Sequence, residues 1–93
     1  MTATSSALIH RLQTLAEALP GVEDCHQVTV RQVRDKLFVS LHCRFDESLS
    51  LDEIHALSTQ IENLLKGEIA ALERVLVHAE PSSPYPPAPV DSE

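Results

Sequence analysis

The sequence predicts an α+β fold, a two-layer sandwich in which two helices cover one face of a three-stranded sheet. Two stretches repeat apolar residues at helical spacings of three and four, and three stretches alternate apolar and polar residues as strands do. These stretches follow the order helix, strand, strand, helix, strand. With 93 residues, the chain has room for one small domain with one thin core.

The first predicted helix follows a polar lead-in, residues 1–6, and ends at Pro20-Gly21. His10 falls on its polar face, so we expect a solvent-exposed histidine there. One apolar face is formed by Leu8, Leu12, Leu15 and Leu19.

The next two predicted elements form a hairpin. Val28 and Val30 alternate with polar neighbours in the first strand, and residues 37–45 alternate in the second. Arg34-Asp35 fits a two-residue turn between them, although it lacks the glycine that such turns prefer. That turn pairs Val30 with Val39, which puts both on one face of the sheet.

The same register pairs Val28 with Leu41 and brings His26 near the level of His42, but on the opposite parity. Regular alternation therefore separates the two histidines. They come together only if His26 precedes the strand or if a bulge turns it.

The second predicted helix has strong boundary signals. Ser50 caps it and Glu53 completes a capping box, while Lys66-Gly67 supplies a favourable last turn and a terminal glycine. His55 lies off the apolar stripe and should face solvent or a neighbouring subunit. The predicted buried face consists of Ile54, Leu57, Ile61, Leu64 and Leu65.

The last predicted strand, residues 75–80, carries the most suggestive pair. His78 and Glu80 lie two residues apart, so they share one face of the sheet at a separation of about 7 Å. An imidazole and a carboxylate at that spacing can supply half of a metal site. An exposed pair with no ligand is the alternative.

The folded domain is predicted to cover residues 7–81, followed by a proline-rich disordered tail, residues 82–93. Pro84 and Pro87 fit the Pro-x-x-Pro pattern of ligands for proline-binding domains. That pattern is short and common, so an ordinary disordered tail is preferred.

The net charge of −7 argues against nucleic acid and favours cations. No apolar run reaches the roughly 18–20 residues of a membrane helix, and no secretion signal opens the chain. Cys25 and Cys43 are too few for a disulfide framework, so a reducing cytoplasm is expected. We expect them to be small buried residues; a thiolate near a bound metal is the alternative.

Four segments carry a resemblance to a known family. They are Pro20-Gly21-Val22 followed by His26, Leu37–His42, Leu51–His55 and Val75–Pro81. Their combination resembles the cytoplasmic C-terminal domain of cation diffusion facilitator (cation efflux) transporters, here without transmembrane helices.

The resemblance implies a metallochaperone-like, ferredoxin-like αββαβ fold. It also implies a homodimer that binds divalent metal, zinc in the first instance, near its interface and regulates an attached membrane transporter domain. Carried over by position, the metal ligands would be His26, His42, His78 and Glu80, with His55 completing a site from the other subunit. Glu80 stands where members of the family often have aspartate.

Two further questions stay open at this point. The chain is either a domain of a transporter or a free-standing metal sensor, buffer or chaperone. A dimerisation or protein-interaction module that binds no metal is the alternative function. An enzyme is not expected, because the sequence shows no nucleophile with a base and no glycine-rich phosphate loop.

Overall fold

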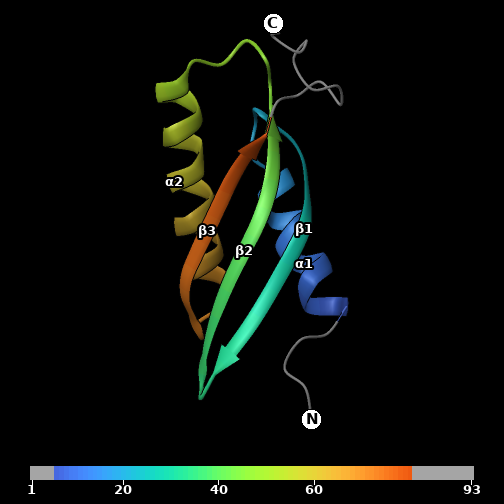
Figure 1. The fold of residues 1–93 in the computed structure, drawn as a ribbon, viewed down its shortest axis with the longest axis vertical. Coiled ribbons are helices and arrows are strands. Elements are labelled where there is room, and N and C mark those ends of the chain that lie inside the picture. Colours follow the sequence, from blue (N-terminus) through green and yellow to red (C-terminus); the bar gives the residue numbers. More distant parts are fainter. Residues whose placement is uncertain (1–5, 81–93) are drawn as a thin grey trace, which may run out of the picture.

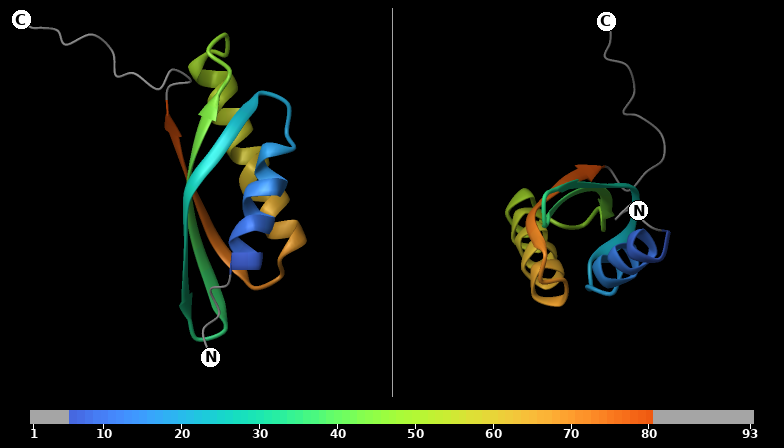
Figure 2. Two further views of the ribbon diagram at one scale, coloured as in Figure 1. Left: turned by 90° about the vertical axis from the view of Figure 1, so that its right-hand side faces the viewer. Right: turned by 90° about the horizontal axis from the view of Figure 1, so that it is seen from below.

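The computed structural model describes residues 6–80 and has the predicted two layers (Figures 1 and 2). Both helices cover one face of the sheet, and the other face is open. The predicted tail and its Pro-x-x-Pro pattern lie outside the described residues. The elements are α1 (Ser6–Glu17), β1 (Val22–Val33), β2 (Lys36–Phe45), α2 (Leu51–Glu68) and β3 (Leu72–Glu80).

The sheet has the order β1-β2-β3, with β2 in the centre. The hairpin prediction is confirmed: β1 and β2 run antiparallel around Arg34-Asp35, and Val30 pairs with Val39. Arg34 adopts a φ of 57°, the left-handed backbone conformation for which a two-residue turn prefers glycine. β3 lies parallel to β2, because α2 carries the chain back along the sheet.

The predicted pairing of Val28 with Leu41 is wrong, because β1 contains a bulge. His26 pairs with His42, and then two residues, Gln27 and Val28, stand opposite Leu41 alone. Gln27 has a φ of 48°, the left-handed backbone that accommodates the extra residue. The bulge shifts the alternation by one residue, so it brings His26 onto the open face beside His42.

Two predicted strands are longer in the structure. β1 begins at Val22, so His26 lies inside the strand rather than at its start. β3 begins at Leu72, three residues before the predicted Val75. A second irregularity at Glu23 interrupts the alternation near the start of β1, which hides this part of the strand from a simple pattern search.

The core lies between the sheet and the two helices. Along β2, every second residue is buried, from Val39 to Phe45, and the residues between them are half-buried on the open face. Among the largest fully buried side chains are Leu12 of α1 and Ile61 of α2. The buried apolar residues are Leu12, Ala16, Val22, Cys25, Val39, Leu41, Cys43, Phe45, Ile61, Leu65, Leu72 and Val75.

The predicted capping box of α2 is confirmed. The Glu53 N–H donates to Oγ of Ser50 at 3.1 Å, and the Ser50 N–H donates to Oε1 of Glu53 at 2.8 Å. The predicted end at Lys66-Gly67 is wrong by one residue, because α2 continues to Glu68 and is capped by Ile69 in an extended conformation. Gly67 is therefore a helical residue.

Replacing Gly67 with alanine should raise the free energy of unfolding by about 0.5–1 kcal/mol, since glycine is costly inside a helix. A Cβ at this position would meet no atom within 4 Å, so the substitution adds no clash. Urea denaturation measures the change. Gly21→Ala is the matched control, because Gly21 has a φ of 97° and its added Cβ would lie 2.8 Å from Leu57; it should destabilise the fold.

Candidate metal centre

Three histidines form one row across the open face of the sheet. His26 of β1 pairs with His42 of β2, which in turn pairs with His78 of β3. The ring centroids of His26 and His42 are 5.8 Å apart, and those of His42 and His78 are 4.7 Å apart in a stacked arrangement. Three elements that are distant in the sequence thus place three imidazoles side by side.

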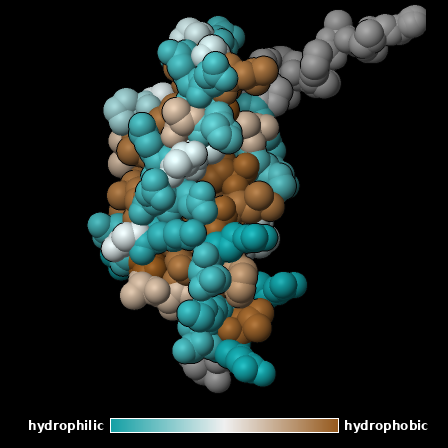
Figure 3. Space-filling model, turned by 90° about the vertical axis from the view of Figure 1, so that its left-hand side faces the viewer, coloured by the Kyte–Doolittle hydropathy of each residue, from teal (hydrophilic) through white to brown (hydrophobic). Residues whose placement is uncertain are grey.

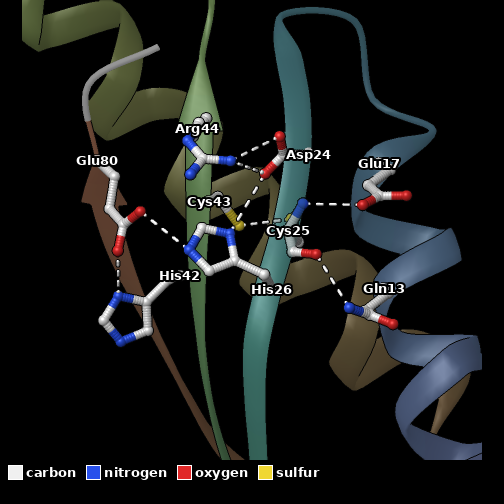
Figure 4. Close-up of polar contacts among 9 residues, drawn as sticks. All are labelled: Gln13, Glu17, Asp24, Cys25, His26, His42, Cys43, Arg44 and Glu80. Atoms are coloured by element: carbon white, nitrogen blue, oxygen red, sulfur yellow. Dashed lines mark hydrogen bonds and ion pairs between the residues drawn. The ribbon is translucent and has the colours of Figure 1, made fainter. Parts of the chain in front are cut away.

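Glu80 connects two of these histidines (Figure 4). Its Oε1 lies 2.9 Å from Nε2 of His26, and its Oε2 lies 2.7 Å from Nδ1 of His42. About 30% of each of these side chains is exposed to solvent. The carboxylate therefore bridges β3 to both other strands while remaining accessible from outside.

The carboxyl group of Glu80 favours its ionised form. Partial desolvation raises its pKa, but the hydrogen bond from His42 and the charges of His26, His42 and Arg44 together lower the pKa below its usual value. Glu80 therefore stays a carboxylate to more acidic pH than an isolated glutamate. An ionised carboxylate is the form that accepts hydrogen bonds and binds cations.

Asp24 and Arg44 extend the site and were not singled out from the sequence. Asp24 Oδ1 lies 3.3 Å from Nδ1 of His26, and its two oxygens lie 3.1 and 3.0 Å from a guanidinium nitrogen of Arg44. The sequence does contain a pattern that indicates Asp24: it lies two residues from His26, the same spacing as between His78 and Glu80 on the last strand. A neutral imidazole has one N–H, so His26 can donate to Asp24 or to Glu80 but not to both.

The structure brings together four of the five predicted ligands. His26 and His42 contact Glu80, and His78 reaches the group by stacking on His42. His55 lies on the exposed face of α2, in the helical layer, and does not join them within one chain.

The donors fit zinc in their chemistry, since imidazole nitrogen and carboxylate oxygen are its common ligands together with thiolate. In the conformation described, no three His, Cys, Asp or Glu side chains of residues 6–80 are arranged to hold an ion. Instead, Nδ1 of His42 is hydrogen-bonded to Glu80, and Nε2 of His26 lies 2.9 Å from the other oxygen of the same carboxylate. Each nitrogen must lose its proton before it can bind a metal.

The remaining part of the open face is a mixture of polar, basic and apolar groups. A hollow of about 380 Å³ lies over Phe38 and Ser40, flanked by Arg31, Arg74 and Leu76. Leu76 is 52% exposed, so this uncovered face of the sheet is partly apolar. From the side of α2, apolar side chains emerge in separate places among polar ones (Figure 3).

Comparison with known proteins places this arrangement in a family. The family model described as the cytoplasmic domain of cation efflux proteins matches residues 4–82. The FieF cation-efflux pump of Serratia proteamaculans is 34% identical over 67 residues, and that of Klebsiella pneumoniae is 28% identical over 75 residues. These matches cover 72% and 81% of this chain but only 22% and 25% of the pumps, so the chain spans about a quarter of its curated relatives.

Solved structures share the fold. The M250L variant of the MamM C-terminal domain has a TM-score of 0.76 at 24% identity, covering 81% of this chain and 94% of that domain. The nickel form of its E289H variant has a TM-score of 0.77 at 21% identity, covering 83% and 98%. Neither helix of residues 6–80 has the length and apolar character needed to span a bilayer. The family match over residues 4–82 shows that the chain belongs to the cation efflux proteins, as their cytoplasmic domain.

Proposed function

We propose that this chain is a divalent-metal-binding domain that forms homodimers and regulates the membrane part of a cation efflux protein. Zinc is the proposed metal, with His26, His42, His78 and Glu80 as ligands. The observation that carries the proposal is the row of three imidazoles drawn from all three strands, two of which contact the accessible carboxylate of Glu80. The nickel form of the E289H variant and the cadmium form of the D249E variant of the similarly folded MamM domain support binding of a divalent ion.

The proposed regulation works through linkage. Ligands drawn from separate strands bind only when those strands, and any partner subunit, are correctly placed. Metal binding then stabilises that arrangement by the difference in affinity between it and the alternatives. Within a full transporter, this change in stability would report the metal concentration to the membrane part.

A second function is favoured by one specific observation. Glu80 already makes a hydrogen bond with His42 and lies 2.9 Å from Nε2 of His26, so these contacts can hold the three strands together without any metal. A metal-independent dimerisation or protein-interaction module of the same fold would use the histidines in this way.

Calorimetric titration of chelator-treated protein with Zn²⁺ separates the two functions. We expect tight binding by the wild type and at least about 100-fold weaker binding by His78→Ala/Glu80→Ala, which loses two proposed ligands. Circular dichroism should show that the double variant remains folded. Absent heat, or equal heat from both proteins, would leave only the metal-independent module.

Acidification should weaken zinc binding in a pH range that identifies the imidazoles. Free imidazole is protonated below about pH 6.5 and cannot then bind a metal. The lowered pKa of Glu80 keeps that carboxylate ionised at a pH where an isolated glutamate would already be protonated. Titrations at about pH 7.5, 6.5 and 5.5 should show the affinity falling with decreasing pH. Affinity that stays constant to about pH 5 would mean that histidine does not bind the ion.

His55 is proposed to act only across a dimer, since it lies apart from the other ligands within one chain. Replacing His55 with alanine should reduce the zinc-dependent shift from monomer to dimer in sedimentation experiments. His10→Ala, on the exposed face of α1, is the control and should leave that shift unchanged. Equal behaviour of the two variants would remove His55 from the site.

A further inference from the structure

Cys25 and Cys43 form a buried pair on the helix-facing side of the sheet. They are paired across β1 and β2; Cys25 is 3% exposed and Cys43 is 0% exposed. Their Sγ atoms lie 2.6 Å apart, about half an ångström more than the length of a disulfide bond. Both are free thiols in the structure. The pair takes no part in the proposed metal site.

The backbone around this pair also suits a disulfide. The Cys25 N–H donates to Oε2 of Glu17 at 2.8 Å, and its carbonyl accepts from Nε2 of Gln13 at 3.0 Å. Both groups of Cys25 thus point away from β2 and toward α1 (Figure 4). This is the non-hydrogen-bonded type of antiparallel pair, in which the Cα atoms lie about 4.5 Å apart, within the range that a disulfide spans.

We propose that Cys25 and Cys43 are a reversible modification site, which a small-molecule disulfide such as oxidised glutathione converts into an internal disulfide. One cysteine attacks oxidised glutathione, forms a mixed disulfide and releases one glutathione thiol. The second cysteine attacks the protein sulfur of that mixed disulfide and releases the other. Two protein thiols are oxidised to one S–S bond, and one glutathione disulfide is reduced to two thiols.

The position of the bond determines its effect. It joins the residue before His26 to the residue after His42, next to the bulge at Gln27. Oxidation therefore clamps the two strands at the point where their pairing is irregular. Because the sulfurs are buried, exchange proceeds through local opening of the edge strand β1 and is slow.

The test uses the chelator-treated chain, so that its outcome is independent of metal binding. The protein is equilibrated in glutathione buffers of increasing oxidised fraction, with a brief urea pulse that opens it. It is then unfolded, alkylated and weighed. We expect neither cysteine to be alkylated and the mass to be two hydrogen atoms lower than that of the reduced, unalkylated chain. The Tm should be about 10 °C higher than that of the reduced chain. Dithiothreitol should reverse all three changes.

Cys25→Ala and Cys43→Ala are the matched controls, since each leaves one thiol that can accept glutathione but cannot close a bond within the chain. Neither should show the rise in Tm. Retention of both thiols in the most oxidising buffer after the urea pulse would overturn the proposal. Stable glutathione adducts or cross-linked dimers of the wild type, in place of the internal bond, would overturn it equally.

Discussion

Replacing His42 with alanine is expected to lower the affinity for zinc by at least about 100-fold. This residue is central to the proposed site. It lies on the middle strand between its partners His26 and His78, and its Nδ1 is hydrogen-bonded to Glu80 at 2.7 Å. Its removal takes away one proposed ligand, the hydrogen bond that orients Glu80 and the ring on which His78 stacks. Calorimetric titration of chelator-treated protein with Zn²⁺ measures the loss.

The control must change a comparable group elsewhere on the same sheet. Ser40→Ala serves, because Ser40 lies two residues before His42 on the same face of β2 and bonds to Thr29 rather than to Glu80. It should bind zinc within about threefold of the wild type, since it alters neither a proposed ligand nor a residue bonded to one. Unchanged zinc affinity in His42→Ala would contradict the proposed ligand set.

The element order could be predicted from the sequence because the strongest local signals agreed with the packing. β2 alternates without interruption from Val39 to Phe45, and its buried face is the apolar one. The capping box of Ser50 and Glu53 fixes the start of α2 through contacts three residues apart. In both cases the information is local, so no knowledge of the tertiary structure was needed.

The details of β1 could not be predicted in the same way. Its two irregularities, at Glu23 and at Gln27, break the period of two, and neither residue is a glycine that would signal a bulge. The contacts that hold the start of β1, from Gln13 and Glu17 to the backbone of Cys25, come from another element. The position of His26 on the open face therefore depends on the assembled sheet.

The candidate site shows the same division. His78 and Glu80 share a strand face, so their proximity follows from the spacing alone. The salt bridge of Asp24 with Arg44 depends on the register across the bulged strand and was missed. Metal binding by these side chains competes with the contacts that Glu80 makes to His42 and His26, and the spacing in the sequence does not determine which of the two is favoured.

Replacing Leu41 with alanine should lower the free energy of unfolding by about 3 kcal/mol. Leu41 is 0% exposed, lies on the central strand immediately before His42 and is opposed by the bulge. The substitution removes apolar contacts and leaves a cavity that the surrounding strands fill only in part. For a domain with about 5–15 kcal/mol of total stability, this is a large fraction, and urea denaturation should show a much lower midpoint.

Leu51→Ala is the matched control for this loss. Leu51 is also a leucine, but it is 85% exposed at the start of α2, so truncation should change the free energy of unfolding by less than about 0.5 kcal/mol. Adding zinc should recover part of the stability of Leu41→Ala if the row of histidines binds it, because the ion stabilises only the folded chain. A similar loss in both leucine variants would mean that the core does not lie between the sheet and the helices at Leu41.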